Sequence, residues 1–86
     1  MAYDSLGDIY TRRGEHDKAM EAFRRALALE SSDSHGHFGL ATLYAALGRN
    51  SSAVREYKEG LKTDPANQDA LAALRELTTA VHDGKD

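Results

Sequence analysis

A repeat of 34 residues constrains the fold of this chain more than any other feature. Leu6 recurs as Leu40 and again as Leu74, and Ile9 recurs as Leu43 and Leu77. The same step relates five more pairs without a gap: Tyr10 and Tyr44, Gly14 and Gly48, Ala19 and Ala53, Phe23 and Tyr57, and Leu27 and Leu61. Repeats of roughly 20–50 residues are typical of solenoids, in which each repeat is one supersecondary unit that stacks on its neighbours. The sequence therefore predicts two full copies and a partial third.

Each copy predicts a pair of helices, because its apolar residues recur at helical spacing. The predicted helices cover residues 2–13, 34–47, 51–63 and 68–82, and a further helix begins near residue 15 and ends before the cluster at 31–34. Gly14 and Gly48 end the first helix of each copy, since glycine adopts a left-handed turn at little cost. Asp64 precedes Pro65, and this ends the fourth helix. We expect residues 83–86 to fray.

Polar residues between these segments predict the helix caps. Asp33 or Ser34 is expected to cap the third helix, Asn50 or Ser51 the fourth, and Asn67 the last. On the second helix, Glu21 and Arg25 are four residues apart, which predicts an exposed ion pair. On the third helix Leu47 is expected to face inward, and Gly36 and Gly39 each cost about 1 kcal/mol relative to alanine. The third helix is therefore expected to be the softest.

Small residues recur at six positions where two helices must approach closely, because a larger side chain would force them apart. These positions are Gly7, Ala19 and Ala26 in the first copy, and Ala41, Ala53 and Gly60 in the second. They predict a tight contact inside each helix pair.

The pattern resembles the tetratricopeptide repeat (TPR), a helix-turn-helix unit of 34 residues. The matching residues are Tyr3, Leu6, Gly7, Tyr10, Gly14, Ala19, Phe23 and Ala26 in the first copy, and Leu40, Ala41, Tyr44, Gly48, Ala53, Tyr57 and Pro65 in the second. The chain departs from the pattern at His37, where a large aromatic is usual, and at Gly60 and Ser31. The resemblance implies an all-α fold of five antiparallel helices in a short right-handed solenoid. It places repeat 1 at 2–33, repeat 2 at 34–67, a capping helix at 68–82 and a tail at 83–86.

The composition argues against several classes of function. The formal net charge of −3 is unlike the basic footprint of nucleic-acid binders. No apolar run reaches the roughly 18 residues that span a membrane, and no signal segment is seen, so we expect a cytoplasmic protein. There is no cysteine, which excludes disulfides and thiolate metal sites. His35 and His37 are two residues apart on a helix and point in different directions, so no metal site is predicted. We expect no enzyme activity and no cofactor.

The resemblance implies instead a protein or peptide partner, bound in the concave groove that the first helix of each TPR lines. Carried over by register, the predicted lining comprises Asp4, Asp8, Arg12, His35, Phe38, Thr42, Asp69 and Glu76. The Lys, Asn and Arg clamp that some members use for carboxylate tails is absent. Acidic residues on either side of Phe38 favour a ligand with Lys or Arg flanking an apolar anchor. The alternative interpretation is that these acids form only a solvated helix face.

The first helix leaves a second question open. Ile9 has the register position of Leu43 and Leu77, where one repeat packs on the repeat before it, yet no helix precedes it here. One interpretation is an exposed isoleucine with no role. The other is a stacking face, formed by Ala2, Ile9 and Arg13, that packs on further repeats or on another subunit and makes the chain a homo-oligomer.

Overall fold

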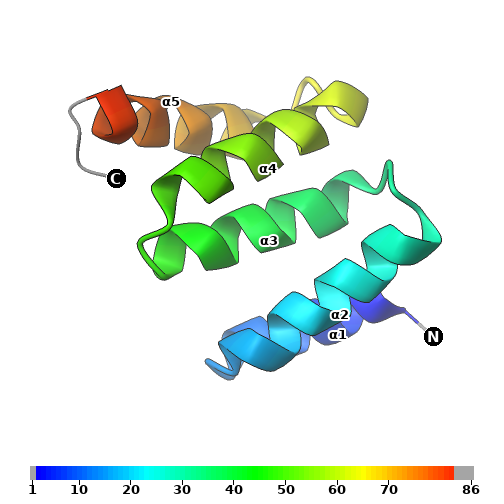
Figure 1. Ribbon diagram of the computed structural model, residues 1–86. Helices are drawn as coiled ribbons and strands as arrows, with labels where there is room; N and C mark the ends of the chain where they lie inside the picture. Colours follow the sequence, from blue (N-terminus) through cyan, green and yellow to red (C-terminus); the bar gives the residue numbers. More distant parts are fainter. Residues whose placement is uncertain (1, 83–86) are drawn as a thin grey trace.

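The computed structural model describes the backbone of residues 2–82 and the side chains of residues 2–79, and within this part it contains five α-helices and no strand. The helices are α1 (Tyr3–Arg12), α2 (His16–Leu29), α3 (Ser34–Ala46), α4 (Asn50–Thr63) and α5 (Gln68–His82). Successive helices run antiparallel and stack in one direction (Figure 1). The predicted all-α fold is confirmed. The predicted fraying of residues 83–86 lies outside the described residues.

The same turn ends α1 and α3. Gly14 has φ +77° and Gly48 has φ +80°, so both lie in the left-handed region that favours glycine. After α1 the amide of Glu15 donates to the carbonyl of Tyr10 at 2.9 Å, and after α3 the amide of Arg49 donates to Tyr44 at 2.8 Å. These bonds satisfy carbonyls that the helix end would leave free. The repeat in sequence is therefore a repeat in backbone geometry.

The first core is organised around Phe23 of α2, which is 1% exposed. A Cβ atom placed on Gly7 of α1 would lie 2.6 Å from the Phe23 ring, and one placed on Gly39 of α3 would lie 2.4 Å from it. The ring is thus in contact with the backbone of two helices. Gly39 therefore has a packing role, whereas the sequence predicted only its cost in helix propensity.

The second core repeats the arrangement one step further along the stack. Ala41 of α3 and Ala53 of α4 are both 0% exposed, and Tyr57 and Ala70 join them in one cluster. At Gly60 of α4 an added Cβ would lie 2.4 Å from the Phe38 ring. The absence of a side chain at Gly60 therefore allows the ring to pack against the α4 backbone. The predicted close approach at the small residues is confirmed.

Local predictions are confirmed in three places and wrong in two. The Asp33 side chain accepts from the His35 amide at 3.1 Å, the Asn67 side chain accepts from the Ala70 amide at 2.9 Å, and Arg25 pairs with Glu21 at 3.5 Å. Leu47, expected to face inward, is 45% exposed, because it follows the last turn of α3. Neither Asn50 nor Ser51 is the N-cap of α4: the helix begins one residue earlier than predicted, so Arg49 is the N-cap and makes no side-chain capping bond.

Candidate functional site

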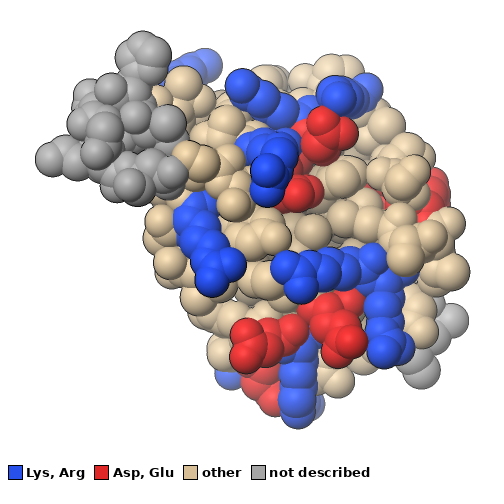
Figure 2. Space-filling view, in the orientation of Figure 1, with Lys and Arg blue, Asp and Glu red and all other residues tan. Residues whose placement is uncertain are grey.

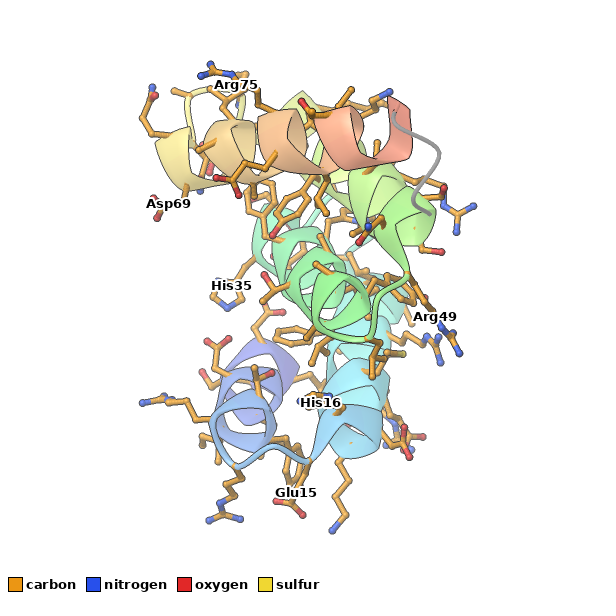
Figure 3. The ribbon with its side chains drawn as sticks, turned by 90° about the vertical axis from the view of Figure 1, so that its left-hand side faces the viewer. Glu15, His16, His35, Arg49, Asp69 and Arg75 are labelled. Carbon is orange, nitrogen blue, oxygen red and sulfur yellow. The ribbon has the colours of Figure 1, made fainter. Side chains whose placement is uncertain are left out.

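The predicted groove lies on the side of the stack formed by α1, α3 and α5. His35 and Asp69 project from this side in Figure 3, whereas Arg49 projects from the opposite side. His35 of α3 reaches across to α1, where its Nε2 atom lies 2.9 Å from Oδ2 and 3.1 Å from Oδ1 of Asp8. Both side chains are about half exposed, 54% for His35 and 43% for Asp8. This contact joins the two repeats at the surface, where a ligand can reach it.

A cavity of about 250 Å³ continues from His35 toward α5. Its lining consists of His35, Phe38, Thr42, Tyr57, Asn67, Asp69 and Ala70. The Phe38 and Tyr57 rings are tilted against each other with centroids 6.2 Å apart, and Thr42 Oγ1 lies 3.3 Å from the Tyr57 hydroxyl. The cavity thus has an aromatic wall with hydroxyl groups on one side and the Asp69 carboxylate on another. Its shape and chemistry suit an apolar side chain followed by a polar or cationic group.

A carboxylate with a raised pKa, that of Asp4, lies beyond His35 on α1. Burial, hydrogen bonding with Asp33 and the negative charge of Asp33 raise the pKa of Asp4 from 3.8 to about 6, and the Asp8 charge adds to this effect. The Oδ1 atom of Asp4 is buried and has no hydrogen-bond partner among the described residues. Asp4, Asp8 and Asp33 therefore make this end of the groove strongly acidic.

The structure brings together only part of the predicted lining. His35, Phe38, Thr42 and Asp69 line one cavity, and Asp8 contacts His35. Arg12 and Glu76 are exposed and do not line this cavity. Sequence reasoning missed Tyr57, Asn67 and Asp33. Tyr57 and Asn67 belong to a second helix and a turn, not to the first helices that the resemblance implied, and no pattern in the sequence placed Asp33 beside Asp4.

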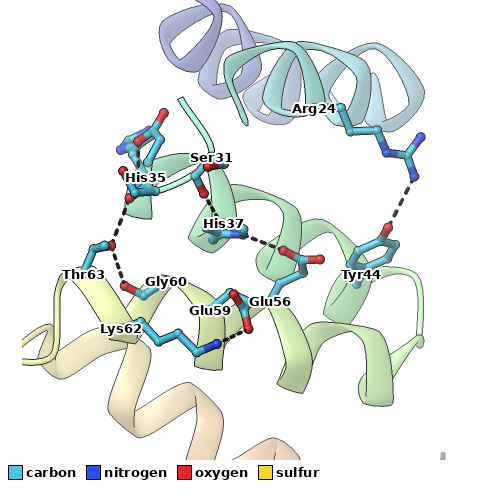
Figure 4. A network of polar contacts seen from close by, with 12 residues as sticks. Arg24, Ser31, His35, His37, Tyr44, Glu56, Glu59, Gly60, Lys62 and Thr63 are labelled. Atoms are coloured by element: carbon cyan, nitrogen blue, oxygen red, sulfur yellow. Dashed lines mark hydrogen bonds and ion pairs between the residues drawn. The ribbon is translucent and has the colours of Figure 1, made fainter. Parts of the chain in front are cut away.

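His37 forms a separate polar contact away from the cavity. Its Nδ1 atom lies 2.8 Å from the Glu56 carboxylate on α4, and its Nε2 atom lies 3.0 Å from the Ser31 carbonyl before α3 (Figure 4). Its side chain is 15% exposed. A neutral imidazole has one N–H, so only the protonated ring can donate to both acceptors. His37 therefore replaces the usual aromatic contact with a polar link between the inter-repeat turn and α4.

Charges of both signs cover the face seen in Figure 2, where Lys and Arg are interspersed with Asp and Glu. Several charged side chains of the described residues pair locally, such as Lys62 with Glu59 at 2.8 Å and Lys18 with Glu15 at 3.3 Å. Within the residues that the structure describes, no three His, Asp or Glu side chains come close enough to hold a metal ion. None of the described helices has the length and apolar character needed to cross a membrane.

The family model for the tetratricopeptide repeat matches residues 10–77, which is most of the chain. The chain belongs to the tetratricopeptide repeat family. TPR domains are generally modules for protein–protein interaction rather than enzymes, so the chain is a helical-repeat interaction module.

Relatives of this TPR domain have diverse names. It is 31% identical to superkiller complex protein 3 of Mus musculus over 87% of this chain and 5% of that protein. It is 30% identical to TPR repeat-containing protein MJ1428 of Methanocaldococcus jannaschii over 84% of this chain and 13% of that protein. It is 25% identical to Hsp70-Hsp90 organizing protein 1 of Glycine max over 94% of this chain and 14% of that protein. The chain thus spans only a small part of the length of these relatives.

Proposed function

We propose that this TPR domain binds a segment of a partner protein in the groove between His35 and Asp69, and that the segment carries Lys or Arg beside an apolar anchor. The cavity lined by Phe38 and Tyr57 supports the proposal, because it is apolar on one wall and has a carboxylate at its rim. The apolar anchor packs on the two rings. The basic residues lie toward Asp69 at one end and toward Asp8 and Asp4 at the other.

Electrostatics favour a cationic ligand over an anionic one. The groove has four aspartates and one histidine along its length, and Asp4 has a buried oxygen without a partner among the described residues. A lysine or arginine side chain supplies a full positive charge and several N–H donors, whereas His35 supplies at most one bond to Asp8 through Nε2. The partner's cation therefore competes well for the carboxylate oxygens that His35 contacts. A carboxylate-ended ligand is repelled.

The test is a titration with a labelled peptide that carries two lysines on each side of a Leu-Leu pair. Binding should weaken as salt increases, because exposed charges are screened over about 10 Å at 0.1 M salt. The double variant Asp4→Asn with Asp8→Asn should weaken binding at low salt and flatten the salt dependence. Unchanged binding by this variant would remove the proposal.

A matched control comes from the same repeat. Asp8→Asn and Asp17→Asn change the net charge equally, and both residues lie on helices of the first repeat. Asp17 lies in the first turn of α2 and is exposed, away from the groove lining. Only Asp8→Asn should weaken the peptide complex. An equal effect of both variants would mean that net charge, not the groove, attracts the peptide.

A second candidate function is self-association through the face of α1 that carries Ala2, Ile9 and Arg13. Ile9 is 40% exposed, whereas Leu43 at the equivalent place in the second repeat is 1% exposed. Arg13 is also exposed and approaches Glu15 at 3.8 Å. In this function the chain is a homo-oligomer that helps to assemble a larger protein. Sedimentation of wild type and of Ile9→Glu tests it: a monomer at all concentrations would remove this candidate.

A cytoplasmic location also stays a prediction.

A further inference from the structure

Three helices hold the same place in successive repeats, and none of the described helices packs on the outer side of one of them, α1. α3 packs on α2, and α5 packs on α4 (Figure 1). The residues at equivalent steps are Gly36, Gly39, Leu40 and Leu43 on α3; Ala70, Ala73, Leu74 and Leu77 on α5; and Ala2, Ser5, Leu6 and Ile9 on α1. No described helix covers the α1 set. The first repeat therefore presents a stacking face of the kind that α3 and α5 bury.

The residue sizes on this face select the helix that fits it. α2 carries Phe23, and the ring needs the missing Cβ of Gly39, since an added Cβ would lie 2.4 Å away. α1 has Ser5 at the place equivalent to Gly39. A helix that carried a phenylalanine at the place of Phe23 would therefore clash with the Cβ atom of Ser5. α4 carries Tyr57, and this ring packs in one cluster with Ala70 and Ala73 of α5. The α1 pair Ala2 and Ser5 is close in size to the α5 pair, so α1 matches the helix that packs on α4.

We propose that α1 of one copy packs on α4 of a second copy, in the place that α5 of the second copy occupies in the monomer. The contact joins different surfaces, so it repeats from copy to copy as a head-to-tail stack that does not close. The proposal rests on the second candidate function, self-association, and specifies the surface that receives the α1 face.

A polar contact inside the chain supports the choice of α4. Arg24 of α2 donates to the Tyr44 hydroxyl of α3 at 3.3 Å (Figure 4). The equivalent residues in the proposed contact are Lys58 on α4 and Tyr10 on α1. In the monomer the equivalent residue of α5 is Thr78. Lys58 is exposed and makes no hydrogen bond or ion pair with the part of the chain that the structure describes. The exchange therefore gives Lys58 a hydroxyl partner from the next copy.

The end of the stack supplies a second reason for the exchange. None of the described helices packs behind α5, and a cavity of about 520 Å³ along its outer side includes Leu71, Leu74, Arg75 and Thr78. Leu71 is 37% exposed there. α1 arrives with α2 packed against it, so the incoming hairpin brings a second helix that α5 does not have among the described residues. The intramolecular contact of α5 opposes the exchange, and assembly is therefore expected only at high protein concentration.

Sedimentation of the full chain over a wide concentration range is the first test. Assembly should extend beyond dimers, and Ile9→Glu should raise the dissociation constant by about 10- to 100-fold, the factor expected when one isoleucine is no longer buried. Ala28→Glu is the matched control, since Ala28 is exposed on α2 and belongs to no part of the proposed contact. Hydrogen exchange of the α5 amides should become faster as the assembly forms. Slower or unchanged exchange of α5 would overturn the displacement.

Disulfide cross-linking identifies the surface directly, because the chain has no native cysteine. A Cβ on Gly36 would lie 3.0 Å from Leu27 Cγ, and the equivalent pair between copies is Ala2 with Leu61. Ala2→Cys mixed with Leu61→Cys should give a mixed disulfide, while Ala2→Cys mixed with Ala28→Cys should not. Disulfides between two Ala2→Cys chains alone would overturn the α4 contact but leave self-association standing. A chain that stays monomeric would overturn both.

Discussion

Substitution of Gly39 by alanine separates helix propensity from packing. Alanine at a mid-helix position is favoured over glycine by about 1 kcal/mol. At Gly39, however, the new Cβ would lie 2.4, 2.5 and 2.7 Å from three carbons of the Phe23 ring. Phe23 is 1% exposed and contacts Gly7 as well as Gly39, so the ring has no free space into which to move. We expect the packing effect to win.

The magnitude follows from these two opposing contributions. Overpacking a core costs about 1–3 kcal/mol, and three contacts below 3 Å on a ring held between two helices place Gly39→Ala at the upper end. After the gain in propensity, the net loss in the free energy of unfolding is about 1–2 kcal/mol, or roughly 5–15 °C in Tm for a domain of this size. Gly36→Ala is the matched control in the same helix. Its Cβ would meet the flexible, half-buried Leu27 side chain at 3.0 Å.

Urea and thermal unfolding followed by circular dichroism at a helical wavelength measure both variants. Gly36→Ala should leave the free energy of unfolding unchanged or raise it by up to about 1 kcal/mol. In the Phe23→Leu background, the loss caused by Gly39→Ala should shrink, because the smaller side chain leaves room for the methyl group. Equal effects of the two glycine substitutions, or a gain in stability from Gly39→Ala, would refute the reasoning.

Three further predictions concern other parts of the core and groove. Ala19→Leu should lower the free energy of unfolding by about 1–3 kcal/mol in urea unfolding, because Ala19 is 0% exposed between two helices; an unchanged midpoint would contradict this. The raised pKa of Asp4, about 6 against 3.8, means that the folded chain binds more protons than the unfolded chain between these values. Stability should therefore fall as pH rises from about 4 to about 6, and Asp4→Asn should reduce this fall by about 1 kcal/mol, a value that allows for screening of the half-buried carboxylate by solvent, when unfolding is measured at each pH; a variant with the wild-type pH profile would count against it. His37→Phe should cost about 1–3 kcal/mol in urea, because Glu56 loses its partner in a half-buried place, whereas an equally stable variant would show that aromatic packing suffices.

The repeat allowed much of the fold to be predicted. A 34-residue step fixes which residues are equivalent, and turns and caps depend on a few adjacent residues. Gly14 and Gly48 therefore indicated the helix ends, and Asp33 and Asn67 the caps, before any coordinates were known. The helix bounds differ from the prediction by one residue at most where both ends were predicted.

Features that depend on contacts between helices could not be predicted in this way. Gly39 looked like a weakness of α3, because its benefit comes from Phe23 on another helix. The acidic end of the groove was recognised from Asp4 and Asp8, but the contribution of Asp33 depends on how the inter-repeat turn lies against α1. Tyr57 reaches the cavity from a second helix, where its ring lies against Phe38 and its hydroxyl lies 3.3 Å from Thr42 Oγ1. Side-chain reach across helices, rather than helical periodicity, decides such details.

Chemical-shift mapping of the labelled chain during titration with the lysine-flanked Leu-Leu peptide tests the proposed function most directly. The account predicts progressive shift changes at the amides of Phe38, Thr42 and Asp69 and at the ring of His35, with smaller changes in the Asp4→Asn, Asp8→Asn double variant. No change at these positions would contradict it. Changes confined to Tyr3 and Tyr10, which line a different cavity between α1 and α2, would also contradict it.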